Sequence, residues 1–170
     1  MKPLYIATFF TLTLFLMGTR AQGQDYKHAI KMKGAFTGFS YKYLTGFEKG
    51  YEVVYLHLNH GHSVAALRVW HEPAFPKISD KWFVCYGYGA HAGIYSQNKR
   101  NNPFRLFDPP TVYHRTFVST GLDGYVGLEY RVLKHPFVIS ADFIPNFEFF
   151  GPDYFRVNFS SALLGLSYVF

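Results

Sequence analysis

Three histidines close together in the sequence, His57, His60 and His62, come nearest to the pattern of a metal site. Imidazole nitrogens are preferred ligands of Zn²⁺ and Cu²⁺. No cysteine or carboxylate beside them completes a coordination shell, and the step from His57 to His60 is not a whole number of two-residue strand periods. The plainer interpretation is a group of polar residues at a hairpin tip, so we predict no metal site and no cofactor.

A second set of reactive side chains consists of charged residues that alternate with apolar ones. Alternation with a period of two places side chains on opposite faces of a β-strand. The charged face carries Lys31, Lys33, Lys42, Asp123, Glu129, Arg131, Asp142 and Glu148. Since buried charges need partners, we expect these residues to form a paired network inside a barrel rather than to line a pore.

Eight alternating segments position these charges. They are 28–33, 37–44, 51–60, 62–72, 82–95, 122–132, 137–149 and the end of 154–170. The alternation in 51–60 and 62–72 is too weak to assign faces. Pro145 cannot donate a ladder hydrogen bond, so we expect a bulge or a strand end there. The first segment is short, and the alternative is a kinked strand that continues through Gly34 and Gly38.

The composition agrees with a barrel in a membrane. The 170 residues include 19 Phe, 14 Tyr and 2 Trp, and only 16% are charged, against about 25% in ordinary soluble domains. The single cysteine, Cys85, excludes an internal disulfide framework and is expected to be buried and inert. No stretch of 18 apolar residues follows the N-terminal segment, so only a closed barrel could span a bilayer.

The N-terminal segment has the features of a secretory signal peptide. Lys2 precedes an apolar run from Leu4 to Met17, and the small residues Ala21 and Gly23 follow as cleavage sites. We therefore predict a signal peptide at residues 1–23 and a mature domain at residues 24–170. Eight strands of about 9–11 residues and their turns fit the length of that domain.

These features together resemble a known family. The signal peptide, the eight alternating segments, the glycine-rich strands and the terminal Phe170, with Tyr168 two residues before it, are similar to the small outer-membrane β-barrels of Gram-negative bacteria. The resemblance covers about residues 29–170 and is closest to uncharacterised members with an X- or W-like barrel. It implies an all-β, eight-stranded, antiparallel, up-and-down transmembrane barrel in the cell outer membrane. It transfers no functional residue, because this fold hosts many roles.

We expect a non-enzymatic structural or accessory envelope protein that docks with a larger membrane complex. The predicted external connection 97–116 carries Lys99, Arg100, Arg105 and Arg115 among aromatic residues, which suits phosphates of lipopolysaccharide or another envelope protein. A solvated loop is the plainer interpretation of that segment. Nucleic acid does not fit an exported protein.

Three alternatives remain open at this point. The barrel could bind or pass a small apolar ligand. It could modify lipid A through His62-Ser63 or His114, although neither lies in a recognisable acyl-transfer motif, and we predict no catalytic residue. A secreted soluble barrel similar to lipocalins or avidin would also alternate, but with its polar face outward.

Overall fold

The computed structural model describes residues 26–34, 37–46, 48–58, 61–96, 99–100, 111–112, 116–132, 135–151, 156–159 and 162–170. The predicted signal peptide lies outside these ranges. The described residues form the strands β1 His28–Lys33, β2 Gly38–Leu44, β3 Lys49–Leu58, β4 Gly61–Pro73, β5 Trp82–Tyr95, β6 Lys99–Arg100, β7 Thr111–Val112, β8 Phe117–Val132, β9 Phe137–Phe143, β10 Asn146–Phe150, β11 Arg156–Asn158 and β12 Ala162–Val169. Within this part of the chain, no helix has the length and apolar character needed to cross a bilayer.

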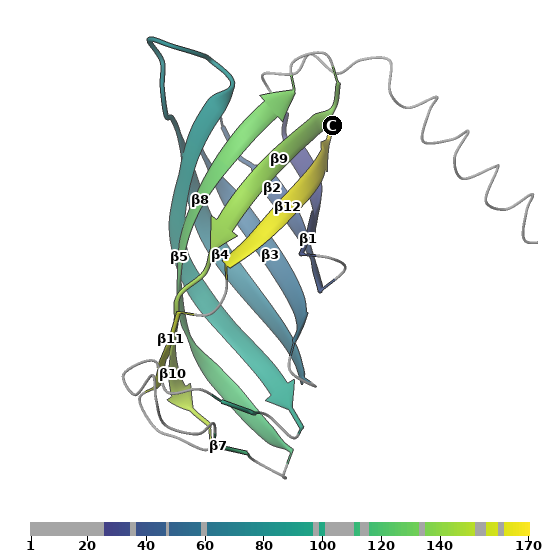
Figure 1. Cartoon of the computed structure of the whole chain (residues 1–170), viewed down its shortest axis with the longest axis vertical. Helices are drawn as coiled ribbons and strands as arrows, with labels where there is room; N and C mark the ends of the chain where they lie inside the picture. Colours follow the sequence, from purple (N-terminus) through teal and green to yellow (C-terminus); the bar gives the residue numbers. More distant parts are fainter. Residues whose placement is uncertain are drawn as a thin grey trace, which may run out of the picture.

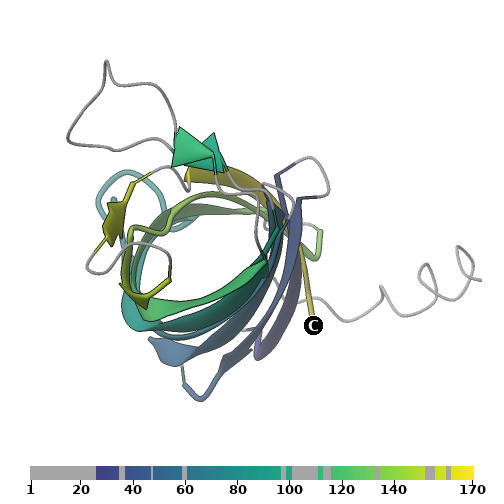
Figure 2. The same ribbon diagram turned by 90° about the horizontal axis from the view of Figure 1, so that it is seen from below.

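In the described ranges, eight of these strands close into an antiparallel barrel, which confirms the predicted fold. Around the barrel these strands follow the order β1, β2, β3, β4, β5, β8, β9 and β12, and each pairs with the next. Pairing of β1 with β12, from Ala29 opposite Val169 to Lys33 opposite Gly165, closes the ring. Figure 1 shows the strands tilted across the barrel, and Figure 2 shows the ring seen along its axis.

The seventh strand of the barrel is interrupted at Pro145, as predicted. β9 ends at Phe143 and β10 begins at Asn146, and both pair with β8. The backbone N–H of Gly124 on β8 donates instead to the carbonyl of Pro145, at 2.8 Å, so the ladder is bridged across the break. β10 then carries the short strand β11 along its other edge.

The two ends of the barrel differ. β5 and β8 extend beyond the other barrel strands at the end where β10, β11 and the β6–β7 ribbon lie (Figure 1). The first hairpin is short there, because β1 stops at Lys33 and Gly34 turns the chain with a φ of +60°. The alternative of a kinked strand through Gly34 and Gly38 is therefore wrong. A positive φ is readily available only to glycine, which explains the residue at this turn.

Side chains alternate between the lumen and the outside along every strand of the barrel. The two strands without assigned faces are now resolved: Glu52 and Val54 of β3 are buried, as are Leu67 and Val69 of β4, whereas Tyr51 is exposed. One apolar cluster fills part of the lumen and consists of Val54, Ala65, Leu67, Val69, Cys85, Tyr125 and Ile144. Cys85 is therefore a buried thiol, as expected.

Glycines on β5 allow the neighbouring strands of the barrel to pack closely. A Cβ atom on Gly89 would collide with the carbonyl oxygen of Ala66 on β4 and lie 2.8 Å from the Leu67 side chain. We predict that Gly89→Ala lowers the free energy of unfolding by about 1–3 kcal/mol. Gly46→Ala is the matched control, because a Cβ there meets nothing within 4 Å. Urea titrations of both variants provide the measurement, and equal midpoints would contradict the prediction.

Candidate functional site

The most unusual feature of the lumen is a group of six charged side chains sealed inside it. We call it the inner charge cluster, and it consists of Lys31, Lys33, Lys42, Glu52, Glu129 and Asp142, each at most 2% exposed. They come from β1, β2, β3, β8 and β9, so strands on opposite sides of the ring converge on one point. Three ammonium groups face three carboxylates, and the cluster is balanced in charge.

Ion pairs connect every member of the inner charge cluster. The Lys31 ammonium lies 3.1 Å from Asp142 and 3.4 Å from Glu129. Lys33 bridges Glu52 at 3.0 Å and Asp142 at 3.2 Å. Lys42 contacts Glu129 at 2.5 Å and Glu52 at 3.6 Å. Buried charges are tolerated only when they are paired in this way, because each one loses its hydration.

Neutral hydroxyl groups add to the shell around the carboxylates. Tyr26 donates to Glu129 at 3.1 Å, and Tyr125 donates to Asp142 at 3.0 Å. Ser40 donates to Glu52 at 2.6 Å. Each acid therefore accepts one hydroxyl hydrogen bond in addition to its ion pairs. These bonds use lone pairs that the lysines leave open, which lowers the cost of burying the carboxylates.

Small residues on the same face make room for the long charged side chains. A Cβ on Gly127 would lie 2.9 Å from the Asp142 carboxylate and 2.8 Å from the Tyr125 hydroxyl. A Cβ on Gly165 would lie 3.0 Å from the Lys31 side chain. The glycines therefore position the site sterically, in addition to allowing close strand packing.

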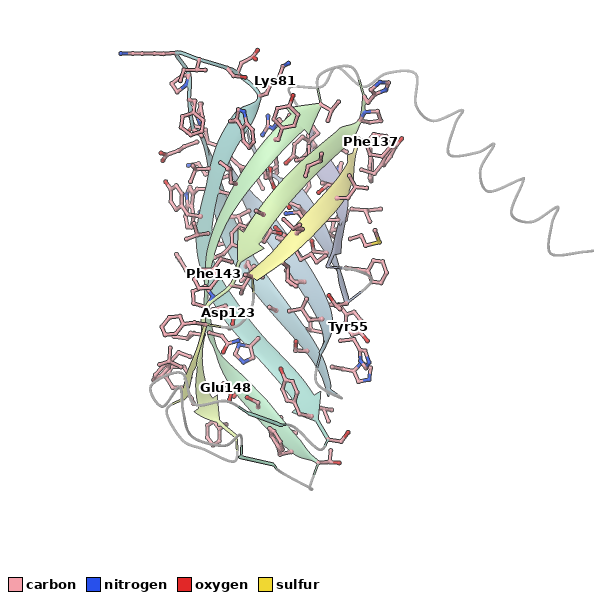
Figure 3. The ribbon with its side chains drawn as sticks, in the orientation of Figure 1. Tyr55, Lys81, Asp123, Phe137, Phe143 and Glu148 are labelled. Carbon is pink, nitrogen blue, oxygen red and sulfur yellow. The ribbon has the colours of Figure 1, made fainter. Side chains whose placement is uncertain are left out.

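The other predicted charges lie inside the barrel but outside this cluster. Arg131 is 5% exposed and its guanidinium lies 3.6 Å from the ring centre of Phe83, near one mouth. Asp123 and Glu148 are both 4% exposed. Figure 3 shows these two acids toward the opposite end, beside β10. The eight predicted charges therefore lie at several levels of the lumen, and five of them belong to the inner charge cluster.

Asp123 forms its own pair with a histidine. Its carboxylate lies 2.7 Å from Nδ1 of His91, and both side chains are buried. A base held by a carboxylate is part of nucleophilic enzymes, which also need a hydroxyl bonded to the other imidazole nitrogen. Ser119, on the same inner face, is buried, but its Oγ forms no hydrogen bond with His91 in the described residues. Among the described residues, no hydroxyl group is hydrogen-bonded to Nε2 of His91.

Three further ligand types meet beside the inner charge cluster. One donor atom each from His71, Cys85 and Glu129 lie within 4.8 Å of one another. Lys42, however, places its ammonium 3.1 Å from Nε2 of His71 and 2.5 Å from Glu129. A lysine ammonium already uses the lone pairs that a metal ion would need and repels a second cation. This arrangement favours a hydrogen-bond network over a metal centre.

The remaining candidates from the sequence are the basic residues of segment 97–116 and the histidines His60, His62 and His114. Lys99 and Arg100 form β6, but their side chains are not described, and Arg105, Arg115, His60 and His114 lie outside the described ranges. His62 is in β4 opposite His57, one position from the turn of this hairpin. His62 is exposed and the adjacent Ser63 points to the other face, so the two side chains cannot act together in acyl transfer.

Sequence reasoning missed Glu52, Ser40, Tyr26, Tyr125 and His71 as partners of the charges. Glu52 carried one usable signal, since a single carboxylate in an apolar segment needs a partner when buried. No protein-family model matches this chain, and neither a curated protein nor a solved structure is similar enough to count as a match. The geometry alone therefore carries the functional argument. Its main feature, in the described residues, is a lumen that holds paired, buried charges.

Proposed function

We propose that this protein is an integral barrel of the bacterial outer membrane, a member of the small eight-stranded family that its sequence resembles. The single observation that carries the proposal is the inverted polarity of the wall. Lys31, Lys33 and Lys42 are 0% exposed inside, whereas Leu164 and Tyr88 are 73% and 64% exposed outside. Such a wall is stable where the outer surface meets lipid and not water.

Aromatic side chains lie on the outer surface toward both ends of the barrel, which supports the proposal because membrane barrels carry aromatic girdles at both interfaces. At one end, Trp82 packs against Tyr130 with ring centres 4.9 Å apart, and Phe137 packs against Tyr168 at 5.9 Å. Toward the other end, Phe39 on β2 and Tyr55 on β3 are direct register partners and are 49% and 38% exposed. Between them lie exposed aliphatic side chains such as Val126. A soluble lipocalin-like barrel would have the reverse pattern, with an apolar lumen and a polar outside.

Within the membrane, we propose a non-enzymatic structural or accessory role in the envelope. The inner charge cluster supports this, because its side chains are at most 1% exposed and are paired with one another across the lumen. A lumen of eight strands is narrow enough for side chains to fill. The proposed partners are lipopolysaccharide, through the basic segment 97–116, and a larger envelope complex.

Membrane fractionation tests the location. The full chain is expressed in a Gram-negative host, and membranes are washed with alkaline carbonate before detergent extraction. We expect the protein, shortened by the predicted signal peptide, in the outer-membrane fraction, with gel migration that changes on heating. Recovery in the soluble periplasm without detergent would overturn the proposal. A crosslinked detergent pull-down with mass spectrometry then tests the accessory role, which requires a reproducible envelope partner.

A cavity at one mouth favours a second candidate, the binding of a small ligand. It has a volume of about 420 Å³ and lies beside the β2–β3 and β4–β5 turns. Its lining includes the apolar side chains of Leu44, Pro73 and Phe83 together with His71 and Arg131. The inner charge cluster lies deeper in the lumen, so the site fits binding better than passage. Co-purified small molecules identified by mass spectrometry would support this candidate.

A further inference from the structure

Two histidines face each other on the outer surface of β3 and β4. His57 and His62 are direct partners in the antiparallel register, and both are exposed. Their Nδ1 atoms lie 3.3 Å apart, and their ring centres are separated by 4.5 Å. Because the pair stands one position from the turn of the hairpin, both imidazoles are accessible from solvent.

The separation of the two nitrogens fits a shared metal ion better than a direct hydrogen bond. A donor–acceptor distance in a good hydrogen bond is about 2.9–3.0 Å. A tetrahedral ion with metal–nitrogen bonds of about 2.0–2.1 Å holds two ligand nitrogens about 3.3–3.4 Å apart. The observed 3.3 Å matches that distance. The side chains would therefore need little movement to bind the ion.

A tyrosine adds a second observation at the same point. The Tyr55 hydroxyl lies 2.6 Å from Nδ1 of His62, and the two rings are stacked with centres 6.0 Å apart. Figure 3 shows Tyr55 projecting outward from the wall near this end of the barrel. Nδ1 of a neutral imidazole offers one lone pair in the ring plane. The Tyr55 hydroxyl and Nδ1 of His57 both lie within hydrogen-bond distance of this one nitrogen and compete for it, whereas a cation would accept a lone pair from each histidine.

We propose that His57 and His62 form a binding site for a divalent transition-metal ion, with water completing the coordination shell. Imidazole ligands select Cu²⁺ and Zn²⁺, with Cu²⁺ bound more tightly, whereas the hard cations Ca²⁺ and Mg²⁺ prefer oxygen. Tyr55 is a positioning residue that orients His62 by stacking. In the proposed membrane orientation, this hairpin lies at the external rim, where the site would take up metal ions from outside the cell.

Metal titration of the purified barrel tests the site directly. The detergent-solubilised protein, without an affinity tag, is titrated with CuCl₂ and with ZnCl₂ by calorimetry, and Cu²⁺ spectra are recorded by electron paramagnetic resonance. We expect one saturable site with nitrogen couplings from two imidazoles. Loss of either ligand, in His57→Ala or His62→Ala, should weaken Cu²⁺ binding at least about tenfold. This test requires only the folded barrel, so its failure would not affect the proposed membrane location.

Two variants serve as controls. His28 is a matched residue at the opposite end of the barrel, where its Nδ1 pairs with the Tyr41 hydroxyl at 2.7 Å instead of with an imidazole. His28→Ala should leave Cu²⁺ affinity unchanged. Tyr55→Phe keeps the stacking ring and should bind at least as tightly as the wild type, because the hydroxyl that competes for Nδ1 of His62 is removed. Undiminished binding by the His57→Ala/His62→Ala double variant, or no saturable binding by the wild type, would overturn the proposal.

Discussion

Replacing Glu129 with glutamine is expected to lower the free energy of unfolding by about 3–5 kcal/mol, the cost of breaking a buried ion-pair group by removing one partner. Glu129 is 1% exposed and contacts the ammonium groups of Lys31 and Lys42. It also accepts the Tyr26 hydroxyl. The substitution keeps the shape of the side chain but removes its charge, so three buried lysines are left facing two carboxylates.

The free energy of unfolding is measured by urea titration of the folded barrel in lipid vesicles. The folded fraction at each urea concentration is read from the heat-sensitive migration on a gel. Glu72→Gln is the matched control, because Glu72 is an exposed acid that accepts a hydrogen bond from Tyr86 at 2.6 Å. Its cost should stay below about 1 kcal/mol. The Glu129→Gln/Lys42→Met double variant removes one charge of each sign and should recover part of the lost stability. A single Glu129→Gln variant as stable as the control would contradict a role for the cluster in stability.

The inner charge cluster also explains how the barrel selects its strand register. A shift of one residue in β1 would turn Lys31 and Lys33 to the outside and bring Ile30 inward. Because the cluster joins strands from opposite sides of the ring, such a shift would leave the three acids of β3, β8 and β9 with Lys42 as the one remaining lysine of the cluster. The network therefore penalises wrong registers strongly, even if its net contribution to stability is small.

Much of this architecture could be predicted from alternation, because on most strands the two faces differ in polarity. Around β9, the series of Phe137 and Ile139 against Ser140 and Asp142 is unambiguous, and Pro145 marks the break by its missing N–H. The short first strand was also identified. Its alternative, the kinked strand, was wrong because Gly34 adopts a left-handed conformation that ends β1.

The remaining parts of the site could not be predicted because they depend on barrel closure. On β3, the inward residue Val54 and the outward residues Tyr51 and Val53 are all apolar, so periodicity could not place Glu52. His71 has the same problem at the end of β4, where its inward neighbours are Leu67 and Val69. The contacts of β1 and β2 with Glu129 on β8 across the lumen depend on the curvature of the closed ring, which no local pattern encodes.

Inserting a charge into the outer wall should separate a membrane barrel from a soluble one. Val126 is 52% exposed in the middle part of β8, where it pairs with Tyr86 on β5 and Phe143 on β9. If this wall faces lipid, Val126→Arg should cost about 2–4 kcal/mol, because a guanidinium near the bilayer midplane loses its hydration. Refolding yield into vesicles should fall with it, and the urea midpoint in those vesicles provides the measurement.

The matched control is Ile78→Arg, at an apolar residue 85% exposed in the turn between β4 and β5. In water, an arginine at either position would keep its hydration, and both changes would cost at most about 0.5 kcal/mol. The loss of unfolding free energy expected for Val126→Arg is therefore several times larger if the wall faces lipid than if it faces water. Equal stability of Val126→Arg and Ile78→Arg would mean that the outer wall does not face lipid, and it would contradict the membrane proposal. A large cost confined to Val126 would identify the exposed apolar wall as a lipid-facing surface.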